Sequence, residues 1–283
     1  MNGEKKKERL DVLLVERGLA ASRERAKSCI MAGLAVVDGK KIDKCGALVP
    51  QTAEIILLGD NIGYVSRGGL KLAKALTYFS IDLSGKIMAD VGASTGGFTD
   101  CALKNGAGKV FAIDVGYGQL AWSLRTDERV INMERTNIRQ VNLERLGVLV
   151  DFAAIDVAFI SLEKVLPVVK EILTPAGEIV ALIKPQFEAG REKIGKKGVV
   201  KDPSIHKEVI LKILDCAKSL LLYPAGICYS PIKGPEGNIE YLLHIKNTDS
   251  MSNIKEMVSA NVNYQAVAEI VAQAHTDLSS GQV

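Results

Sequence analysis

Strand-like and helix-like segments alternate along most of the chain from residue 70 onward, and this alternation constrains the fold more than any other feature. The strand-like runs are short and apolar, and the segments between them carry apolar residues at helical spacing. The strand-like runs lie at residues 87–91, 110–114, 130–133, 152–155 and 179–183. The helix-like segments lie near residues 70–79, 96–105, 118–125, 142–147 and 161–173. Such alternation predicts an α/β domain with a doubly wound parallel sheet.

The end of this region departs from the alternation. Residues 203–222 have a helical pattern, but the strand-like runs 226–229 and 240–245 follow with only a turn between them. Two successive strands without an intervening helix predict an antiparallel pair at one edge of the sheet. A parallel α/β sheet with an antiparallel edge hairpin is the architecture of class I, Rossmann-like methyltransferases. A last helix, from Ile254 to about Ala274, is expected to pack over the sheet.

The chain before residue 62 follows a different pattern. Two short helices are predicted at residues 9–16 and 22–32, and β-like runs follow at residues 34–37, 47–49 and 54–58. Three glycines between residues 63 and 69 are typical of a linker. The sequence therefore predicts a small α+β domain at residues 1–61, a linker at 62–69 and a larger domain at 70–283.

The two parts also differ in charge. Residues 1–75 contain 14 Lys and Arg against 9 Asp and Glu, a net charge of +5 (14 − 9), whereas the rest of the chain has 22 against 24 (36 − 14 and 33 − 9), a net charge of −2. A basic front on a near-neutral body favours a domain that faces nucleic acid. A solvated lysine-rich tail is the alternative interpretation.

Composition excludes several classes of protein. With 47% hydrophobic and 24% charged residues, the chain is a globular protein rather than a disordered or fibrous one. No stretch reaches the roughly 18 consecutive apolar residues of a membrane span, and the charged start from Met1 to Glu8 is unlike a secretory signal. The 5 scattered cysteines contain no Cys-x-x-Cys pair, which excludes a disulfide framework and a cysteine zinc site. We expect a cytoplasmic protein that binds neither membrane nor metal.

A glycine-rich turn follows the first strand of the larger domain. From Asp90 to Phe98 the sequence reads Asp-Val-Gly-Ala-Ser-Thr-Gly-Gly-Phe, which matches neither the dinucleotide pattern nor the P-loop. Glycines in this turn let the backbone approach a ligand closely. Asp114 closes the second strand, where a carboxylate can accept hydrogen bonds from both hydroxyls of a ribose, and Asn137 follows the third strand. A structural turn with a solvated strand-end acid is the alternative.

Four ionisable residues stand at the ends of predicted elements. Lys71 begins the first helix, Asp156 follows the fourth strand, Lys184 follows the fifth, and Glu240 begins the last strand. Because the carboxyl ends of parallel strands share one crevice, Asp156 and Lys184 are expected to meet at the ligand face. A second amine alongside lowers the pKa of a lysine, and carboxylates orient it. Taken singly, each of the four is better explained as a solvated strand-end charge, and it is their combination that favours a functional site.

Longer motifs carry a family resemblance. Arg9-Leu10-Asp11, Gly18-Leu19, Ser22-Arg23-Glu24, Ala26-Lys27 and Gly33 resemble the small RNA-binding module named after ribosomal protein S-four. Further motifs resemble the TlyA family of rRNA 2′-O-methyltransferases, often labelled haemolysins, within the wider FtsJ-like group. These motifs are Tyr64–Leu72, Asp90–Thr99, Asp114–Leu120, Glu134–Asn137 and Ile183–Glu188.

The resemblance implies an activity and a set of site residues. It implies S-adenosylmethionine as methyl donor and a cytidine ribose in ribosomal RNA, free or within a ribosomal subunit, as acceptor. The family's catalytic Lys-Asp-Lys-Glu tetrad falls on Lys71, Asp156, Lys184 and Glu240. The donor-binding residues implied are Gly92, Ala93, Ser94, Thr95, Gly96, Gly97, Phe98, Asp114 and Asn137. Candidate RNA contacts are Arg9, Arg23, Lys27, Lys40, Lys44 and Arg67. Apart from the resemblance, residues 190–201 carry five basic residues among three glycines, which predicts either a mobile loop that binds phosphate or, equally, a solvated disordered loop.

Three other functions compete with this one. A base methyltransferase on the same fold usually needs an Asn-Pro-Pro-Tyr-like or catalytic cysteine motif, and neither occurs. A ribosome-binding factor with little catalysis would not need the tetrad. A membrane-lytic haemolysin would need a signal, a membrane span or a strongly cationic amphipathic helix, and the sequence offers none of them.

Overall fold

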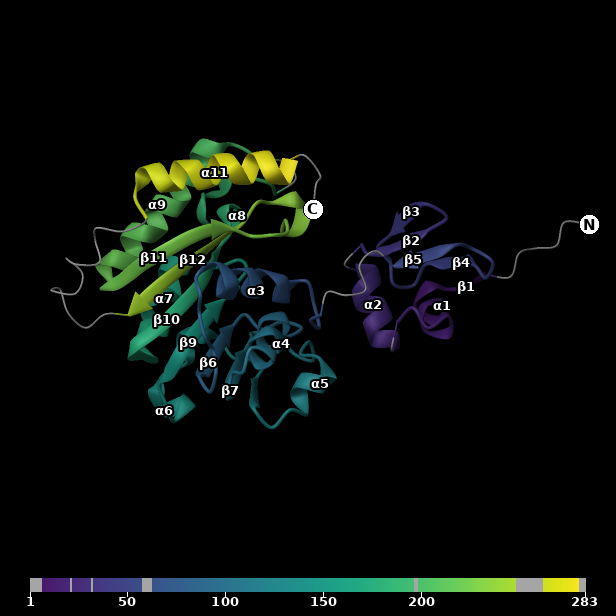
Figure 1. Ribbon diagram of the computed structural model, residues 1–283, viewed down its shortest axis with the longest axis horizontal. Coiled ribbons are helices and arrows are strands. Elements are labelled where there is room, and N and C mark those ends of the chain that lie inside the picture. The colour runs from purple at the N-terminus through teal and green to yellow at the C-terminus, as the bar shows by residue number, and fades with distance from the viewer. Residues whose placement is uncertain are drawn as a thin grey trace, which may run out of the picture. The chain divides into compact units, whose positions relative to one another are not determined.

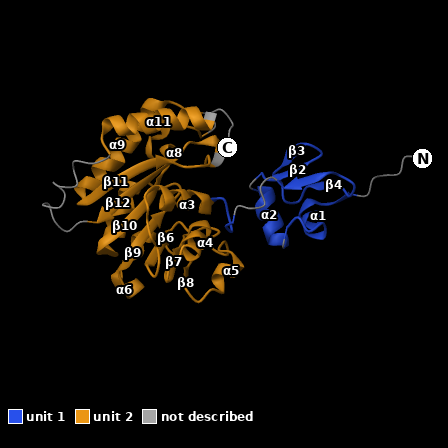
Figure 2. Ribbon diagram, viewed as in Figure 1, with its two compact units in different colours: residues 1–67 blue, residues 68–283 orange. Residues whose placement is uncertain are grey.

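The computed structural model describes residues 7–20, 22–31, 33–57, 63–195, 198–247 and 262–279. The chain divides into two compact units, Met1–Arg67 and Gly68–Val283, each with a hydrophobic core of its own (Figure 2). The division falls within the segment predicted as a linker. Gly68 and Gly69, which were predicted as part of the linker, belong to the first helix of the larger unit, α3 (Gly68–Tyr78).

The larger unit is built on a seven-stranded sheet in the order β11-β12-β10-β9-β6-β7-β8 (Figure 1). The pairings from β10 through to β8 are parallel, whereas β12 is antiparallel to both β10 and β11. The predicted parallel sheet with an antiparallel edge pair is thus confirmed. Its strands are β6 (Ile87–Val91), β7 (Lys109–Ile113), β8 (Val130–Met133), β9 (Val150–Ile155), β10 (Leu173–Ile183), β11 (Leu222–Tyr229) and β12 (Tyr241–Asn247).

The strand order changes direction beside β6. From β6 the chain moves through β7 to β8 on one side, and then returns to place β9 on the other side. Loops at such a switch point diverge, which leaves a crevice at the carboxyl ends of the two central strands. The crevice therefore lies where Gly92 follows β6 and Asp156 follows β9.

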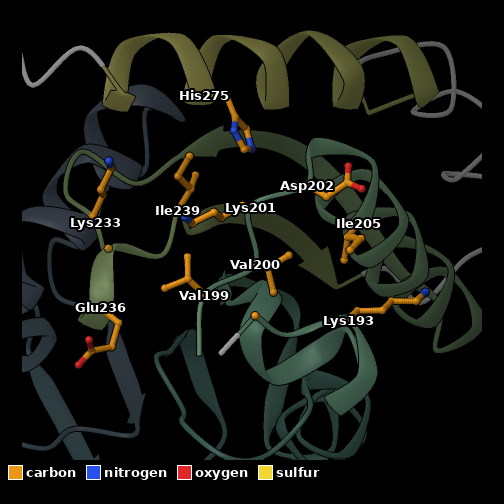
Figure 3. A pocket seen from close by; sticks show the side chains of 12 residues that line it. Lys193, Val199, Val200, Lys201, Asp202, Ile205, Lys233, Glu236, Ile239 and His275 are labelled. Carbon is orange, nitrogen blue, oxygen red and sulfur yellow. The ribbon is translucent and has the colours of Figure 1, made fainter. Parts of the chain in front are cut away.

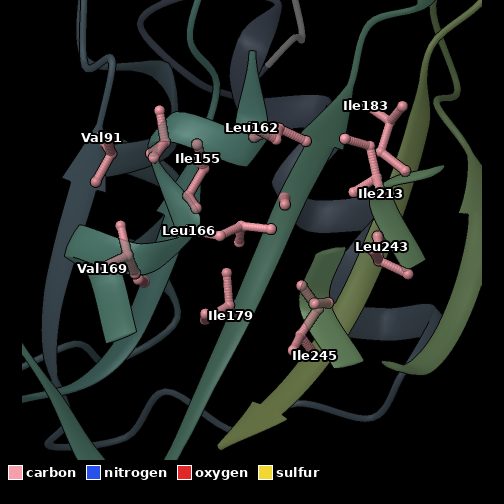
Figure 4. Packing of buried hydrophobic residues seen from close by; sticks show 14 of the residues in the cluster. Val91, Ile155, Leu162, Leu166, Val169, Ile179, Ile183, Ile213, Leu243 and Ile245 are labelled. Atoms are coloured by element: carbon pink, nitrogen blue, oxygen red, sulfur yellow. The ribbon is translucent and has the colours of Figure 1, made fainter. Parts of the chain in front are cut away.

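Helices cover both faces of the sheet (Figure 1). Alternate residues of the central strands, such as Ile155, Ile179 and Leu243, form one core cluster with residues of α7, α9 and α11 (Figure 4). On the other face, α3 packs against α4, which contacts β6 and β7. The helices are α3 (Gly68–Tyr78), α4 (Gly97–Lys104), α5 (Trp122–Arg125), α6 (Leu143–Leu146), α7 (Leu166–Glu171), α8 (Pro185–Glu188), α9 (Pro203–Ser219) and α11 (Tyr264–Ser279). Short 3-10 turns are η1 (Ile138–Gln140), η2 (Leu162–Lys164), η3 (Arg191–Lys193) and η4 (Pro235–Gly237). None of the helices in the described ranges is long and apolar enough to cross a membrane.

Several predicted boundaries are wrong for local reasons. The helix predicted at 118–125 is only α5, because the backbone N–H groups of Gln119 and Leu120 donate to the Glu134 carboxylate instead of joining a helix. The helix predicted at 161–173 is divided into two elements, η2 and α7. A proline occupies the first turn of α7, a position that proline favours at the start of a new helix. The strand predicted at 226–229 begins at Leu222, directly after Leu221 leaves α9 with a φ of 57°.

The predicted last helix lies partly outside the described residues. Its first part, residues 254–261, is in that undescribed range, and α11 continues past Ala274 to Ser279. The buried positions Val267, Val271 and Ala274 recur at helical spacing, so α11 packs its apolar side over the sheet as predicted.

The smaller unit has two helices and two small sheets. Its elements are β1 (Lys7–Arg9), α1 (Leu10–Glu16), α2 (Arg23–Met31), β2 (Ala35–Val37), β3 (Lys40–Ile42), β4 (Leu48–Pro50) and β5 (Ile55–Leu57). The sheets have the orders β3-β2-β5 and β1-β4. Strand β3 was not predicted because it is short and polar. Asp38 and Gly39, with φ of 47° and 77°, form the two-residue turn that connects it to β2 in a tight hairpin. Arg9 ends β1 and precedes α1, so the predicted first helix starts one residue too early.

Candidate active site

Four charged side chains form a row of ion pairs at the carboxyl ends of the central strands. Lys184 Nζ lies 2.5 Å from Asp156 Oδ1. Lys71 Nζ lies 3.9 Å from Asp156 Oδ2 and 2.7 Å from Glu240 Oε2. The charges alternate along the row in the order Lys184, Asp156, Lys71, Glu240. The structure thus brings together four side chains that come from distant parts of the sequence.

The sheet topology explains this meeting. Asp156 and Lys184 directly follow β9 and β10, which are parallel neighbours, so both stand at the same edge. Glu240 precedes β12, which runs the other way and sets Tyr241 opposite Ile183. The start of an antiparallel strand therefore lies beside the end of β10. Sequence periodicity placed Glu240 at a strand end but did not give this register.

Burial differs between the members of the row and is complete only at Glu240, at one end. The exposed fraction of the side chain is 20% for Asp156, 11% for Lys184, 9% for Lys71 and 0% for Glu240. The Glu240 side chain also accepts a hydrogen bond from Gln186 Nε2, which lies 3.5 Å from its Oε1. A buried charge without a partner is strongly destabilising, so Lys71 and Glu240 hold each other in place. Of the four side chains, that of Asp156 is the most exposed to solvent.

A cavity of about 470 Å³ adjoins this row. It lies at the switch point of the sheet, and its volume is that of a pocket for a small organic ligand. Asp156 lines it and so belongs both to the cavity and to the row of charges. The other lining residues are Val91, Gly92, Ser94, Ile113, Asp114, Val115, Gln119, Thr136, Asn137, Ile138, Val157, Ala158, Phe159 and Ile160.

Asp114 is held by two backbone donors at the end of β7. Ser94 N donates to its Oδ2 at 2.8 Å, and Gly116 N donates to its Oδ1 at 2.6 Å. These bonds fix the plane of the carboxylate, and each oxygen keeps a second lone pair for a ligand. Asn137 also lines the cavity, and its side-chain oxygen caps η1 by accepting from Arg139 N at 3.0 Å.

The glycines of the turn permit close packing within the protein. Gly92 has a φ of 91°, and a Cβ there would lie 2.4 Å from the backbone oxygen of Asp156. Gly96 has a φ of 93°, and a Cβ there would lie 2.2 Å from Leu124 Cδ1. Side chains at these positions would separate β6 from β9 and α4 from α5. The structure thus gives both glycines a packing role within the chain, and their approach to a ligand stays a prediction.

The predicted donor-binding residues divide into two groups. Gly92, Ser94, Asp114 and Asn137 line the cavity. The remaining five turn residues are not among the lining residues, and four of these are buried in the start of α4 and its approach. They are Ala93, Thr95, Gly96, Gly97 and Phe98, of which only Thr95 is exposed.

Comparison with known proteins agrees with this geometry. The FtsJ-like methyltransferase family matches residues 64–247, and the S4 domain matches residues 8–55. The chain belongs to the FtsJ-like methyltransferase family. It is 43% identical to the 16S/23S rRNA (cytidine-2′-O)-methyltransferase TlyA of Mycobacterium tuberculosis over 254 residues, 89% of this chain and 95% of that one.

Two further relatives cover most of the chain. Hemolysin A of Brachyspira hyodysenteriae is 42% identical over 241 residues, 83% of this chain and 98% of the relative. A solved structure from Streptococcus thermophilus, provisionally described as a hemolysin, is 45% identical with a TM-score of 0.77 and covers 99% of both chains. The family resemblance predicted from the motifs is therefore confirmed.

Asp90 is a buried acid that the sequence assigned no role. Its Oδ2 accepts from Thr99 N at 2.9 Å and from Thr99 Oγ1 at 2.6 Å, while its Oδ1 has no partner among the described residues. Burial raises the pKa of this carboxyl to about 7, against the opposing hydrogen bonds from Thr99. Its position in the glycine-rich motif was the available signal, but the sequence did not show that it is fully buried.

Glu188 joins the two loops that carry Asp156 and Lys184. Its Oε1 accepts from Leu162 N at 2.8 Å, and its Oε2 accepts from Ser161 Oγ at 2.6 Å. Glu188 ends α8, which begins directly after Lys184, and Ser161 lies in the loop that follows Asp156. Burial raises the pKa of the Glu188 carboxyl, and the hydrogen bonds from Ser161 and Leu162 oppose this rise. The sequence alone does not reveal this link between the two loops.

The six candidate RNA contacts lie in the smaller unit, and two of them form ion pairs with an acid of the same unit. Arg9 Nε and Arg23 Nη2 donate to Asp11 at 2.8 and 3.0 Å. The hydrogen bond from Arg9 is the main cause that lowers the Asp11 pKa to about 2. Both guanidinium groups remain about half exposed, so Asp11 orients them at the surface. Of the others, Lys40 and Lys44 are exposed, whereas Lys27 and Arg67 are half-buried.

The basic segment 190–201 is only partly described. Lys196 and Lys197 lie outside the described residues. Lys193 pairs with Glu208 at 2.5 Å, and Lys201 is exposed.

Proposed function

We propose that this protein transfers a methyl group from S-adenosylmethionine to the 2′-hydroxyl of a cytidine in ribosomal RNA, free or within a ribosomal subunit, in the cytoplasm. The observation that carries the proposal is the row of Lys184, Asp156, Lys71 and Glu240 beside the cavity that contains Asp114. The name of the Mycobacterium tuberculosis relative, which covers most of this chain, supports the same reaction and acceptor.

The cavity residues suit the adenosyl part of the donor. Asp114, with both oxygens held by backbone donors, would accept from the two ribose hydroxyls, and Asn137 would contact the adenine. Gly92 and Ser94 would border the methionine part. When bound, S-adenosylmethionine supplies a methyl group on a positively charged sulfur and leaves as a neutral thioether.

The charged row suits activation of a ribose hydroxyl. The Lys184 amine, in its neutral form, would accept the proton of the 2′-hydroxyl while Asp156 fixes its direction from 2.5 Å. The Lys71 ammonium would orient Asp156 through its second oxygen, Oδ2. Lys71 in turn is held in position by its ion pair with Glu240. The loops that carry Asp156 and Lys184 are tied together by Glu188.

Substitution of Lys184 tests this function. In single-turnover methyl transfer to ribosomal subunits, Lys184→Ala should lower the rate by the roughly 10²–10⁴-fold typical of losing a general base. Lys184→Arg should lower it as well, because a guanidinium is not deprotonated in proteins. Donor affinity and thermal melting should stay near those of the unaltered protein, and Lys218→Arg, an exposed change on α9, serves as the matched control.

Three outcomes would count against the proposal. Near-normal transfer by the Lys184→Arg variant would rule out this lysine as the base. Methyl transfer to RNA that carries 2′-deoxycytidine at the modified position would mean that a base, not the ribose, is methylated. RNA binding without any methyl transfer by the unaltered protein would favour a ribosome-binding factor.

We also propose that the smaller unit, which includes the S4 domain, supplies most of the RNA affinity. Each unit has its own core, so removal of residues 1–67 should leave the core of the larger unit intact. The shortened chain should bind S-adenosylmethionine normally but bind ribosomal RNA much more weakly, because the exposed lysines and arginines that face phosphate are lost. Calorimetry and filter binding measure the two affinities. Methylation at the normal rate by the shortened chain would contradict this division.

A further inference from the structure

A second cavity, of about 870 Å³, lies in the larger unit apart from the one that contains Asp114. It opens between the segment that leads into α9, the loop before β12, and α11, whose His275 points into it (Figure 3). Its walls combine apolar and charged side chains. The lining residues are Lys193, Gly195, Val199, Val200, Lys201, Asp202, Ile205, Lys233, Glu236, Gly237, Ile239 and His275.

The walls of this cavity are fixed by hydrogen bonds. Asn238 is buried and joins two wall segments, since Val200 N donates to its Oδ1 at 3.2 Å and its Nδ2 donates to Gly198 O at 3.0 Å. The fully buried His206 holds the same segment, with its Nε2 2.9 Å from Val200 O. The cavity is therefore a built feature of the fold rather than a gap between loops.

Two lysines of the cavity are available to a ligand. Lys201 and Lys233 are exposed, and neither has a carboxylate within ion-pair distance in the part of the chain that the structure describes. Lys193 pairs with Glu208, and Asp202 is engaged as the cap of α9 through Ser204. Glu236 is the remaining charge on the rim.

His275 adds a hydrogen-bonding group. Its ring lies 4.8 Å from that of His206, and its Nε2 is buried without a partner among the described residues. Burial lowers the pKa of His275, so its ring is neutral near pH 7 and Nε2 offers one hydrogen bond, as donor or acceptor. Apolar wall residues, two unpaired lysines and one orphaned imidazole nitrogen together match a ligand that has a flat or sugar-like body and a phosphate.

One loop connects the wall of this cavity to the charged row of the proposed active site. Ile239 lines the cavity, and the next residue is Glu240 of the charged row. Gly234, beside Lys233, lies so close to this acid that a Cβ would be 2.1 Å from Glu240 Oε1. The loop from Lys233 to Ile239 thus faces the charged row on one side and the cavity on the other.

We propose that this cavity binds a nucleotide of the RNA strand that neighbours the nucleotide being methylated, with its phosphate at Lys201 and Lys233 and its sugar and base over Val199, Val200 and Ile239. The proposal rests on the methyltransferase function proposed above. RNA is favoured over a free metabolite because the cavity adjoins the charged row at which a ribose of that strand would be held.

Paired charge changes test the proposal. The full-length double variant Lys201→Ala/Lys233→Ala should bind ribosomal RNA at least about tenfold more weakly at low salt. The slope of log K against log salt should fall by about 0.7, because the two lysines together neutralise one phosphate of a single strand. Glu236→Gln should act in the opposite direction and tighten binding, because it removes the carboxylate from the rim. Lys218→Ala removes a lysine on the surface of α9 outside the cavity and is the control for loss of positive charge elsewhere.

Donor affinity, thermal melting and the activity of the unaltered protein separate the possible results. Unchanged RNA affinity and salt slope in the double variant, with methyl transfer by the unaltered protein, would overturn this inference alone. If the unaltered protein does not methylate ribosomal RNA, the proposed function itself fails. Binding of cytidine monophosphate that is lost in the double variant while RNA binding persists would assign the cavity to a free nucleotide and overturn the RNA assignment.

Discussion

The ion pair of Lys71 and Glu240 gives a stability prediction that is independent of catalysis. Lys71→Met keeps the length of the side chain but removes the ammonium that lies 2.7 Å from Glu240 Oε2. Glu240 is fully buried and would keep only the 3.5 Å contact with Gln186. Removing one partner of a buried ion pair costs about 3–5 kcal/mol. For a unit of this size, each kcal/mol lowers Tm by about 2–4 °C, so a fall of about 6–20 °C is expected.

A double-mutant cycle makes this prediction refutable. Glu240→Gln removes the other charge, and Lys71→Met/Glu240→Gln leaves neither charge buried without a partner. The double variant should therefore be more stable than Lys71→Met alone, by about 2 kcal/mol or more. Calorimetry and urea unfolding measure the three values, with Lys109→Met at an exposed site as the control. Small and additive losses would refute the reading of this pair as a buried, mutually dependent ion pair.

Two other predictions concern acids near the first cavity. Asp114→Ala should weaken S-adenosylmethionine binding by on the order of 1.5–3 kcal/mol for each charged hydrogen bond lost, measured by titration calorimetry, and unchanged affinity would remove Asp114 from the donor site. Asp90→Asn should remove a pH dependence of stability. The Asp90 pKa of about 7 lies above its unfolded value, so its contribution is full below about pH 4 and is lost as pH rises to about 7, a change of about 4 kcal/mol at most. An unfolding free energy with the same pH profile in Asp90→Asn would contradict the raised pKa.

The larger fold was predictable because its signals are local and periodic. Buried parallel strands are continuous apolar runs, and helices between them repeat at their own spacing, so type and order follow from the residues. The hairpin of β11 and β12 was predictable because no helix fits between them. Boundaries were less predictable: Gln119 and Leu120 leave the helical pattern only because the distant Glu134 accepts their backbone N–H groups.

The candidate site was predictable in membership but not in geometry. The strand ends and the family motifs identified Lys184, Asp156, Lys71 and Glu240, but their order in the row depends on the antiparallel register of β12. Buried acids were harder still, because a sequence does not distinguish an acid clamped between loops from a solvated one. Glu188 is such a case.

The order of the charged row distinguishes the two lysines. Asp156 is the only one of the four side chains among the described residues that line the first cavity, so we expect the donor methyl group and the hydroxyl to meet beside it. Lys71 lies between Asp156 and the fully buried Glu240, with its closer contact, 2.7 Å, directed to Glu240. Lys184 pairs with Asp156 alone at the other end of the row. We therefore infer that Lys184 meets the hydroxyl, while Lys71 and Glu240 form the fixed support that sets the position of Asp156.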